Sequence, residues 1–258
     1  MTATPATDLR GRTVLVTGAG GGVGRGIALA CAAEGAHVVV TSRGENGAET
    51  VALIEARGDM AEWVRCDVTR RADVSAAIDA AVMHTGGLDA LVHNATSSRS
   101  SEPVRLEAVD HALWEEHASV SLRAAYFCAV AALPHLAARG GRFLLMTSPA
   151  GMEGSPTLPV YGIVKGALRG FAKSLAREWG PLGVNVNLVS PLAATPALDQ
   201  AMIEDPAMEA RLAARIPLGR VGDSEADIGP VVAFLLGDGA RYITGQTVVV
   251  DGGRFMGL

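Results

Sequence analysis

Short apolar, β-branched runs alternate with longer helix-like segments along the chain. Residues 13–17, 37–41 and 63–66 are such runs and predict buried strands. The segments after the first two runs predict helices, which we place at residues 27–33 and 48–56. Because strands that alternate with helices form parallel sheets covered on both faces, this part of the chain already indicates an α/β fold.

The same alternation continues to the C-terminus. It predicts one domain over residues 9–258, a doubly wound parallel sheet of about seven strands with helices on both faces. Residues 1–8 lack the pattern and are expected to form a flexible tail. The further elements that we expect are strands at 88–93, 143–147, 184–189 and 246–250 and helices at 74–83, at 114–136 and around Tyr161.

Composition and charge narrow the class of protein. Of 258 residues, 49% are hydrophobic, enough for a sizeable core, and the formal charge of −5 argues against nucleic acid or an anionic membrane as main partner. The three cysteines lie in apolar segments without a Cys-x-x-Cys pair, as in reduced cytosolic proteins. The N-terminus shows no basic-then-apolar signal, and the uncharged run 124–138 is too short for a bilayer span. We therefore expect a soluble, cytoplasmic protein.

A glycine-rich turn, residues 18–24, separates the first predicted strand from the first predicted helix. Strand, glycine turn and helix in this order are what a dinucleotide requires. The glycines let the backbone approach the pyrophosphate, and the free N–H groups at the helix start favour its negative charge. A turn that merely collects glycine is the alternative for this loop taken alone.

Tyr161 and Lys165 are four residues apart and stand one turn apart on the same face of a helix. An ammonium group close to a phenol lowers the pKa of the phenol, so the pair could move a proton at neutral pH. Ser148 follows the predicted strand 143–147, and open α/β sheets bind ligands at such strand ends. An exposed helix pair is the alternative for the Tyr-x-x-x-Lys spacing taken alone.

Two other chemistries find no support in the sequence. The six histidines form no His-Glu-x-x-His or similar ligand set, so no metal site is predicted. Ser148 is not part of a Gly-x-Ser-x-Gly motif, so we interpret it as a hydrogen-bond donor to a carbonyl rather than as a nucleophile.

Taken together, these motifs resemble the classical short-chain dehydrogenases/reductases over about residues 9–253. The motifs that carry the resemblance are Thr17-Gly18…Gly22-Val23-Gly24, Cys66-Asp67-Val68, His93-Asn94-Ala95, Ser148, Tyr161…Lys165 and Ile243-Thr244-Gly245-Gln246…Val250-Asp251-Gly252-Gly253. The resemblance implies a Rossmann-type fold and an oxidoreductase that is usually a homotetramer, or a homodimer.

The resemblance also implies a role for each matching residue. Tyr161 would give or take the hydroxyl proton, Lys165 would lower the pKa of Tyr161 and hold the nicotinamide ribose, and Ser148 would orient the substrate oxygen. The implied cofactor-binding residues are Thr17, Gly18, Gly20, Gly22, Val23, Gly24, Ser42, Arg43, Asp67, Val68, Asn94, Ala95, Tyr161, Lys165, Pro191 and Thr195.

The end of the second predicted strand bears on the choice of dinucleotide. An acidic residue there selects NAD(H), whereas an arginine accommodates the 2′-phosphate of NADP(H). This chain has Ser42 and Arg43 and no acid, similar to the NADP-preferring members. Gly21 stands where many of those members carry a basic residue, and a solvated surface charge is the alternative for Arg43. We expect NADP(H) to be preferred over NAD(H).

The chain departs from the family pattern at three places. Ser121 replaces the asparagine that, in the family, holds a water linking the lysine to solvent, and Thr96 replaces a glycine. After Pro191 a glycine is missing and Thr195 comes one residue early, although we expect it still to reach the nicotinamide carboxamide. Residues 192–216 are expected to form a substrate lid.

These observations favour an NADP(H)-dependent oxidoreductase, a ketoreductase that interconverts a secondary alcohol and a ketone by hydride transfer. Ser121 is counted with Ser148, Tyr161 and Lys165 as a candidate catalytic residue. Two alternatives stay open: a nucleotide-binding regulatory or scaffold protein with weak or no catalysis, and a reductase of C=C or imine bonds on the same fold. Substrate identity, direction and stereochemistry do not follow from the sequence.

Overall fold

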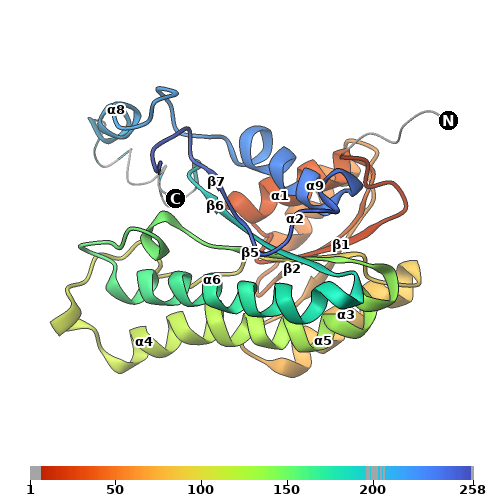
Figure 1. The fold of residues 1–258 in the computed structure, drawn as a ribbon. Helices are drawn as coiled ribbons and strands as arrows, with labels where there is room; N and C mark the ends of the chain where they lie inside the picture. The colour runs from red at the N-terminus through yellow and green to blue at the C-terminus, as the bar shows by residue number, and fades with distance from the viewer. Residues whose placement is uncertain (1–6, 196–197, 199–202, 204, 206, 257–258) are drawn as a thin grey trace.

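The computed structural model describes residues 7–195, 198, 203, 205 and 207–256, so most of the predicted tail lies outside the described residues. Seven parallel strands form one sheet in the order β3-β2-β1-β4-β5-β6-β7, which confirms the predicted doubly wound sheet (Figure 1). The strands are β1 Thr13–Thr17, β2 His37–Ser42, β3 Ala61–Arg65, β4 Ala90–His93, β5 Arg142–Met146, β6 Asn185–Pro191 and β7 Thr247–Val250.

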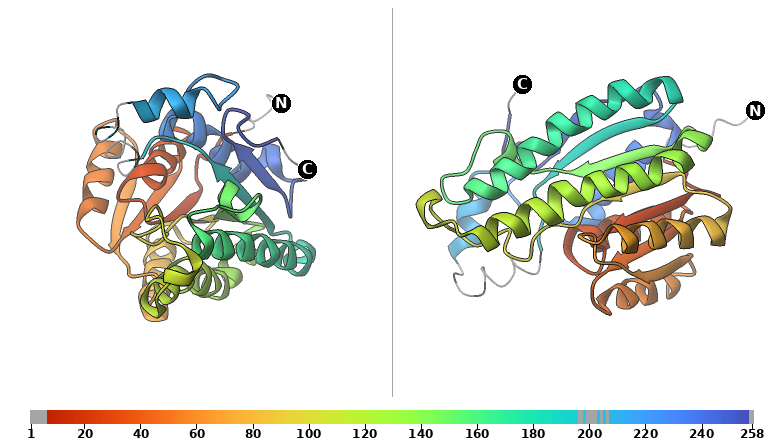
Figure 2. Two further views of the ribbon diagram at one scale, coloured as in Figure 1. Left: turned by 90° about the vertical axis from the view of Figure 1, so that its left-hand side faces the viewer. Right: turned by 90° about the horizontal axis from the view of Figure 1, so that it is seen from below.

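Helices cover both faces of the sheet. Figures 1 and 2 show α1, α2 and α9 on one side, with α3, α5 and α6 on the other. The helices are α1 Gly22–Ala33, α2 Asn46–Glu55, α3 Arg71–Thr85, α4 His111–His117, α5 Ala124–Arg139, α6 Pro159–Trp179, α8 Ala207–Ala213 and α9 Gly229–Leu236.

The sheet separates two hydrophobic cores because successive side chains of a strand point to opposite faces. In β1, Val14 and Val16 pack with Ile27 of α1, whereas Leu15 belongs to the core shared with α3, α5 and α6. All five residues of β1 are buried, which explains why the strand is a continuous apolar run rather than an alternating one.

Helix α9 has no counterpart among the predicted elements. Its sequence from Gly229 is apolar on all sides, so it lacks the 3.6-residue periodicity that marks a helix. It packs closely on α1, where a side chain at Gly229 would collide with Ala30. Asp223, whose carboxylate accepts the N–H groups of Glu225 and Ala226, is the local signal for the preceding helical turn η5, Ser224–Ile228.

The long helix predicted at 114–136 is longer and contains an irregular turn. It runs as α4, then η2, a π-helical turn over Ala118–Arg123, and then α5. The stretch His111–Arg139 has 29 residues and contains an 18-residue window with a mean hydropathy of 1.4, a length and composition that would allow it to cross a membrane. In the folded chain, however, one face of α5 is packed in the core beneath the sheet.

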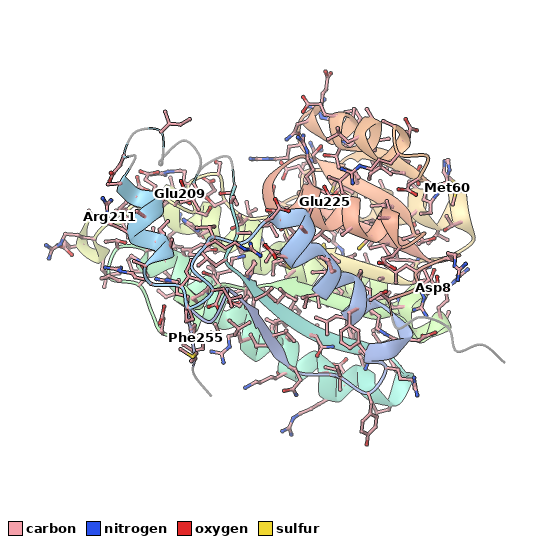
Figure 3. The ribbon with its side chains drawn as sticks, turned by 90° about the horizontal axis from the view of Figure 1, so that it is seen from above. Asp8, Met60, Glu209, Arg211, Glu225 and Phe255 are labelled. Carbon is pink, nitrogen blue, oxygen red and sulfur yellow. The ribbon has the colours of Figure 1, made fainter. Side chains whose placement is uncertain are left out.

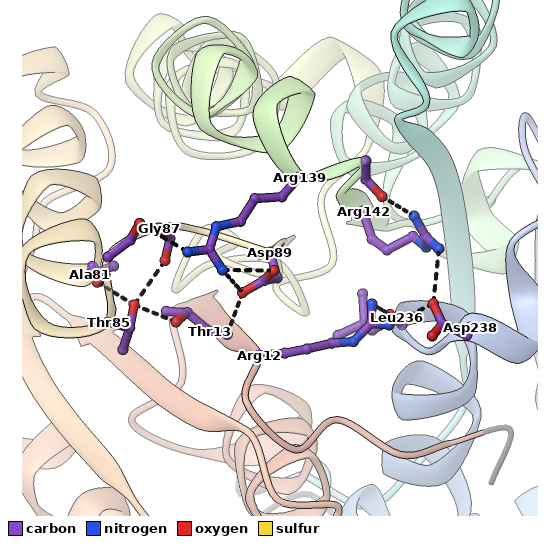
Figure 4. Close-up of polar contacts among 12 residues, drawn as sticks. Arg12, Thr13, Ala81, Thr85, Gly87, Asp89, Arg139, Arg142, Leu236 and Asp238 are labelled. Carbon is purple, nitrogen blue, oxygen red and sulfur yellow. Dashed lines mark hydrogen bonds and ion pairs between the residues drawn. The ribbon is translucent and has the colours of Figure 1, made fainter. Parts of the chain in front are cut away.

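A polar network joins the amino ends of the strands to nearby helices (Figure 4). Asp89 accepts the backbone N–H of Thr13 at 2.9 Å and contacts Arg139 at 3.3 Å. Arg12 donates to Asp238 at 2.6 Å. These charged groups stabilise the amino-terminal ends of the strands. The ligand site is expected at the opposite, carboxyl-terminal ends.

Helix α8 lies toward the carboxyl-terminal ends of the strands. Figure 3 shows its residues Glu209 and Arg211 at the end of the molecule opposite Asp8 and Met60, which precede β1 and β3. The predicted lid segment 192–216 thus begins at the carboxyl end of β6 and includes α8, with residues 196–197, 199–202, 204 and 206 outside the described part.

Candidate active site

A cleft of about 880 Å³ lies along the carboxyl ends of the strands. The sheet order reverses between β1 and β4, and in open α/β sheets such a switch point is where ligands bind. The predicted site residues that line the cleft are Gly18, Gly20, Gly22, Val23, Gly24, Ser42, Arg43, Asp67, Val68, Asn94, Ala95, Ser148, Tyr161, Lys165, Pro191 and Thr195.

Two predicted residues do not line the cleft. Thr17 is buried behind the loop, where its hydroxyl oxygen accepts the backbone N–H groups of Asn94 at 3.0 Å and Ala95 at 3.1 Å. Ser121 is fully buried in η2, and its hydroxyl has no hydrogen-bond partner within the described residues. Both side chains therefore lie behind the wall of the cleft rather than in it.

Other cleft residues escaped sequence reasoning. Ser100, Ser101 and Asn46 come from loops or helix starts whose approach to the cleft depends on the tertiary fold. Val120 and Thr147 also line the cleft. They directly precede the predicted residues Ser121 and Ser148, and this neighbourhood in the sequence could have indicated them. Of the predicted lid, the described residues that reach the cleft are Leu192, Ala193, Thr195 and Leu198.

The glycine-rich turn brings backbone into the cleft at the start of α1. Gly18 has a φ of +66°, and a Cβ there would lie 2.9 Å from the Cα of Ala95. A Cβ at Gly24 would lie 2.5 Å from the carbonyl oxygen of Gly18 and would collide with the amide of Asn94. Larger residues are excluded because the turn, the Asn94 segment and the helix start are in direct contact.

Ser148, Tyr161 and Lys165 come together because the segment after β5 is pinned to α6. Thr147 donates its hydroxyl to the carbonyl of Lys165 at 2.9 Å, and a Cβ at Gly151 would lie 2.5 Å from the Lys165 carbonyl carbon. The ammonium of Lys165 donates to the Met146 carbonyl at 2.9 Å and lies 5.6 Å from the centroid of the Tyr161 ring.

Burial controls the protonation of this trio. It lowers the pKa of Lys165 to about 8 and raises the pKa of Tyr161 above its usual value, while the nearby Ser148 hydroxyl acts in the opposite direction on Tyr161. The expected lowering of the Tyr161 pKa by Lys165 is not found here. The ammonium instead faces the Met146 carbonyl, and burial of the phenol dominates.

Comparison with known proteins identifies the family. A family profile described as enoyl-(acyl carrier protein) reductase matches residues 18–254. A 3-oxoacyl-(acyl-carrier-protein) reductase of Staphylococcus aureus is 34% identical over 248 residues, which cover 95% of this chain and 98% of that protein. The 2-(S)-hydroxypropyl-CoM dehydrogenase 3 of Xanthobacter autotrophicus is 34% identical over 251 residues, 95% of this chain and 97% of that protein.

A solved structure agrees with this assignment. A protein of Sinorhizobium meliloti assigned as a short-chain alcohol dehydrogenase is 40% identical, with a TM-score of 0.89 and coverage of 97% of this chain and 98% of that one. The chain belongs to the classical short-chain dehydrogenase/reductase family. It is an NAD(P)-dependent oxidoreductase of the alcohol and ketone class.

The cleft of this short-chain dehydrogenase/reductase fits a dinucleotide. Its glycine turn leaves no room for a Cβ at Gly18 or Gly24, and the N-terminus of α1 opens beside it. Asp67 lines the cleft while its carboxylate accepts the N–H and hydroxyl of Thr69, so its side chain is held in place. Among the described residues, no group of three or more His, Cys, Asp or Glu side chains could hold a metal ion.

The departures from the family pattern have structural consequences. Thr96 is exposed at the cleft rim and leaves Ala95 in contact with Gly18. After β6, Leu192 and Thr195 both line the cleft, and the Thr195 hydroxyl oxygen accepts the N–H of Leu198 at 3.2 Å. The altered loop therefore still presents Thr195 to the cleft.

Proposed function

We propose that this chain reduces a ketone to a secondary alcohol with NADPH, with Tyr161 as general acid. The observation that carries the proposal is that Ser148, Tyr161 and Lys165 line the same cleft as the glycine-rich turn. The dinucleotide, when bound, supplies the hydride. Residues of the glycine turn would hold its pyrophosphate, and Asn94, Pro191 and Thr195 line the cleft nearer to the catalytic side chains.

The raised pKa of Tyr161 supports its role as the general acid. A phenol that keeps its proton at pH 7 can give that proton to the oxygen of a ketone as negative charge develops there. The Ser148 oxygen accepts the Ala150 N–H at 3.3 Å, which leaves its own hydrogen for the same substrate oxygen. Lys165 uses one N–H on Met146 and has two more for ribose hydroxyls.

The preference for NADPH rests on the end of β2. Arg43 is exposed on the cleft, with no ion pair within the described residues. The neighbouring Ser42 hydroxyl is occupied, since it donates to Gly44 O at 2.6 Å and accepts from Trp63 Nε1 at 2.9 Å. Arg43 is thus the cation available to a 2′-phosphate. A structural relative from Beutenbergia cavernae, 33% identical and with a TM-score of 0.88 over 96% of this chain and 98% of that one, has NADP bound at low occupancy.

The cofactor proposal is tested with Arg43→Gln, matched by Arg177→Gln on the exposed side of α6. Loss of a charge-assisted contact should raise KM for NADPH on the order of tenfold in the first variant, with KM for NADH nearly unchanged. If Arg43→Gln changed KM for NADPH and KM for NADH by the same factor, or changed neither, Arg43 would not be the residue that binds the 2′-phosphate.

The reaction is tested by following NADPH oxidation with 3-oxoacyl thioesters, sugar ketones, small diketones and, to separate C=C reduction, an enoyl thioester. Tyr161→Phe should lower turnover on the order of 100-fold, because it removes the acid. Tyr242→Phe, whose side chain is fully exposed in the segment between α9 and β7, serves as control. Unchanged turnover in Tyr161→Phe refutes the mechanism. Tight NADPH binding with no turnover on any substrate would favour a nucleotide-binding protein without catalysis.

We also propose a cytoplasmic homotetramer, or a homodimer. Apolar side chains on the outer faces of α5 and α6 support association, because Tyr126, Val130 and Ile163 are 51%, 41% and 49% exposed. Light scattering on the purified protein, with Val130→Glu beside the native chain, tests this. A native chain that is monomeric at micromolar concentration would contradict it.

A further inference from the structure

His93, the last residue of β4, is buried behind the cleft and does not line it. Its imidazole has a partner at each nitrogen. Nδ1 lies 3.2 Å from the hydroxyl oxygen of Thr17, and Nε2 lies 3.0 Å from the backbone carbonyl oxygen of Ser121. One side chain therefore joins the last residue of β1 to the π-helical turn η2.

The neighbouring donors determine which ring nitrogen carries the proton. The Thr17 oxygen already accepts two backbone N–H groups, from Asn94 and Ala95, so its own hydrogen is available to Nδ1. Nδ1 is then the acceptor, and the single ring proton on Nε2 is donated to the Ser121 carbonyl. Burial and the nearby charge of Lys165 lower the pKa of His93 to about 4, so this neutral tautomer persists at pH 7.

Each end of His93 acts on a different wall of the cleft. Through Thr17 it supports the backbone of Asn94 and Ala95, which line the cleft beside the glycine turn. Ser121 follows Val120, another lining residue, and η2 packs against α6, the helix of the proposed acid. The π-helical spacing changes the α-helical hydrogen-bond pattern, so that a side-chain donor can reach a carbonyl in this turn.

We propose that His93 is a positioning residue that sets the two walls of the cleft relative to each other. Its Nδ1 acts through Thr17 on the backbone of Asn94 and Ala95, and its Nε2–H acts on η2. This inference rests on the proposed function of the cleft. It assigns no proton transfer to His93. The neutral ring supplies two hydrogen bonds without placing a second cation beside Lys165.

Two amide variants separate the two ends. The oxygen of His93→Asn can replace Nδ1 as acceptor for Thr17, while the donor to Ser121 is lost. The longer His93→Gln can return an N–H to the Ser121 carbonyl, while the acceptor for Thr17 is lost. Each change removes one buried hydrogen bond, an effect on the order of tenfold in an equilibrium or rate constant.

We expect His93→Asn to lower kcat about tenfold with the Kd of NADPH nearly unchanged, and His93→Gln to raise that Kd about tenfold with a smaller change in kcat. Fluorescence titration measures Kd without turnover, and circular dichroism confirms that both variants are folded at the assay temperature. His93→Leu, which removes both hydrogen bonds, should both lower kcat and raise the Kd of NADPH.

The proposal would be overturned if His93→Asn and His93→Gln lowered kcat by the same factor and also raised the Kd of NADPH by the same factor. His93 would then be an ordinary core residue. Native values in both variants would overturn the proposal as well. Tyr161→Phe is run alongside as the test of the proposed function. If that variant stays active, the acid role of Tyr161 fails, while the divergence of Kd between His93→Asn and His93→Gln still decides the role of His93.

Discussion

Replacing Lys165 by methionine should make the protein more stable at neutral pH while abolishing the proposed catalysis. Lys165 is 3% exposed and is one of only two lysines in the chain. Its ammonium has one hydrogen-bond acceptor, the carbonyl of Met146, and no carboxylate partner within the described residues. A buried cation with so little compensation costs stability, and proteins retain such groups for function.

The structure sets the size of the effect. Burial lowers the pKa of Lys165 from 10.5 to about 8. The unfolded chain therefore binds more protons than the folded one between these values, and the unfolding free energy of the native protein rises with pH across this window. At pH 7 the full cost, about 3 kcal/mol, is present. The hydrogen bond to Met146 recovers about 1 kcal/mol, so Lys165→Met should be about 2 kcal/mol more stable at pH 7.

The assay is urea denaturation of the cofactor-free protein at several pH values between 7 and 10.5. The advantage of Lys165→Met should shrink as pH rises and reverse near the upper end, where the native lysine is neutral in both states. Lys173→Met, exposed on the same helix, should follow the native pH dependence. A less stable Lys165→Met at pH 7, or an advantage that does not change with pH, would refute the reasoning.

Three further perturbations have defined outcomes. Gly24→Ala should abolish NADPH binding in titrations, because its Cβ would lie 2.5 Å from the Gly18 carbonyl, whereas Gly170→Ala, with open space around it, should bind normally. Asp89→Ala should lower the unfolding free energy by about 1–3 kcal/mol in urea with kcat unchanged, since it removes the link between β1 and β4 far from the cleft. As pH falls from 6.5 toward 4, the unfolding free energy of the native chain should decrease by up to about 3 kcal/mol more than that of His93→Gln. The reason is that His93 takes up a proton in the unfolded chain at a higher pH than in the folded chain. The same dependence of the unfolding free energy on pH in both proteins would contradict this.

Most of the fold could be predicted because the strands are continuous apolar runs. The parallel sheet buries both faces of β1 and β2, and its strands appear in the sequence as uninterrupted β-branched segments. Strand β3 is only partly buried and mixes polar with apolar residues, and here the predicted boundaries 63–66 differ from the observed Ala61–Arg65. Helix α9 was missed for the opposite reason, since uniform hydrophobicity leaves no helical period.

The predicted site residues that follow a strand, such as Asn94 after β4 and Ser148 after β5, line the cleft. The prediction and the structure differ where a side chain binds neighbouring backbone instead of lining the cleft. Thr17 was expected to touch the cofactor, yet its hydroxyl holds the N–H groups of the neighbouring loop. The sequence could not distinguish these roles, because both place a small polar residue after a buried strand.

The same distinction explains how this chain can carry Ser121 where its family has asparagine. The contact that holds η2 uses the backbone carbonyl of residue 121, which every amino acid supplies, and the donor comes from His93 on β4. The side chain at position 121 can then change from an amide to a hydroxyl without loss of that contact. Under the proposed role of His93, the geometry of the turn depends on His93, and the buried Ser121 hydroxyl, which has no hydrogen-bond partner within the described residues, is not needed for it.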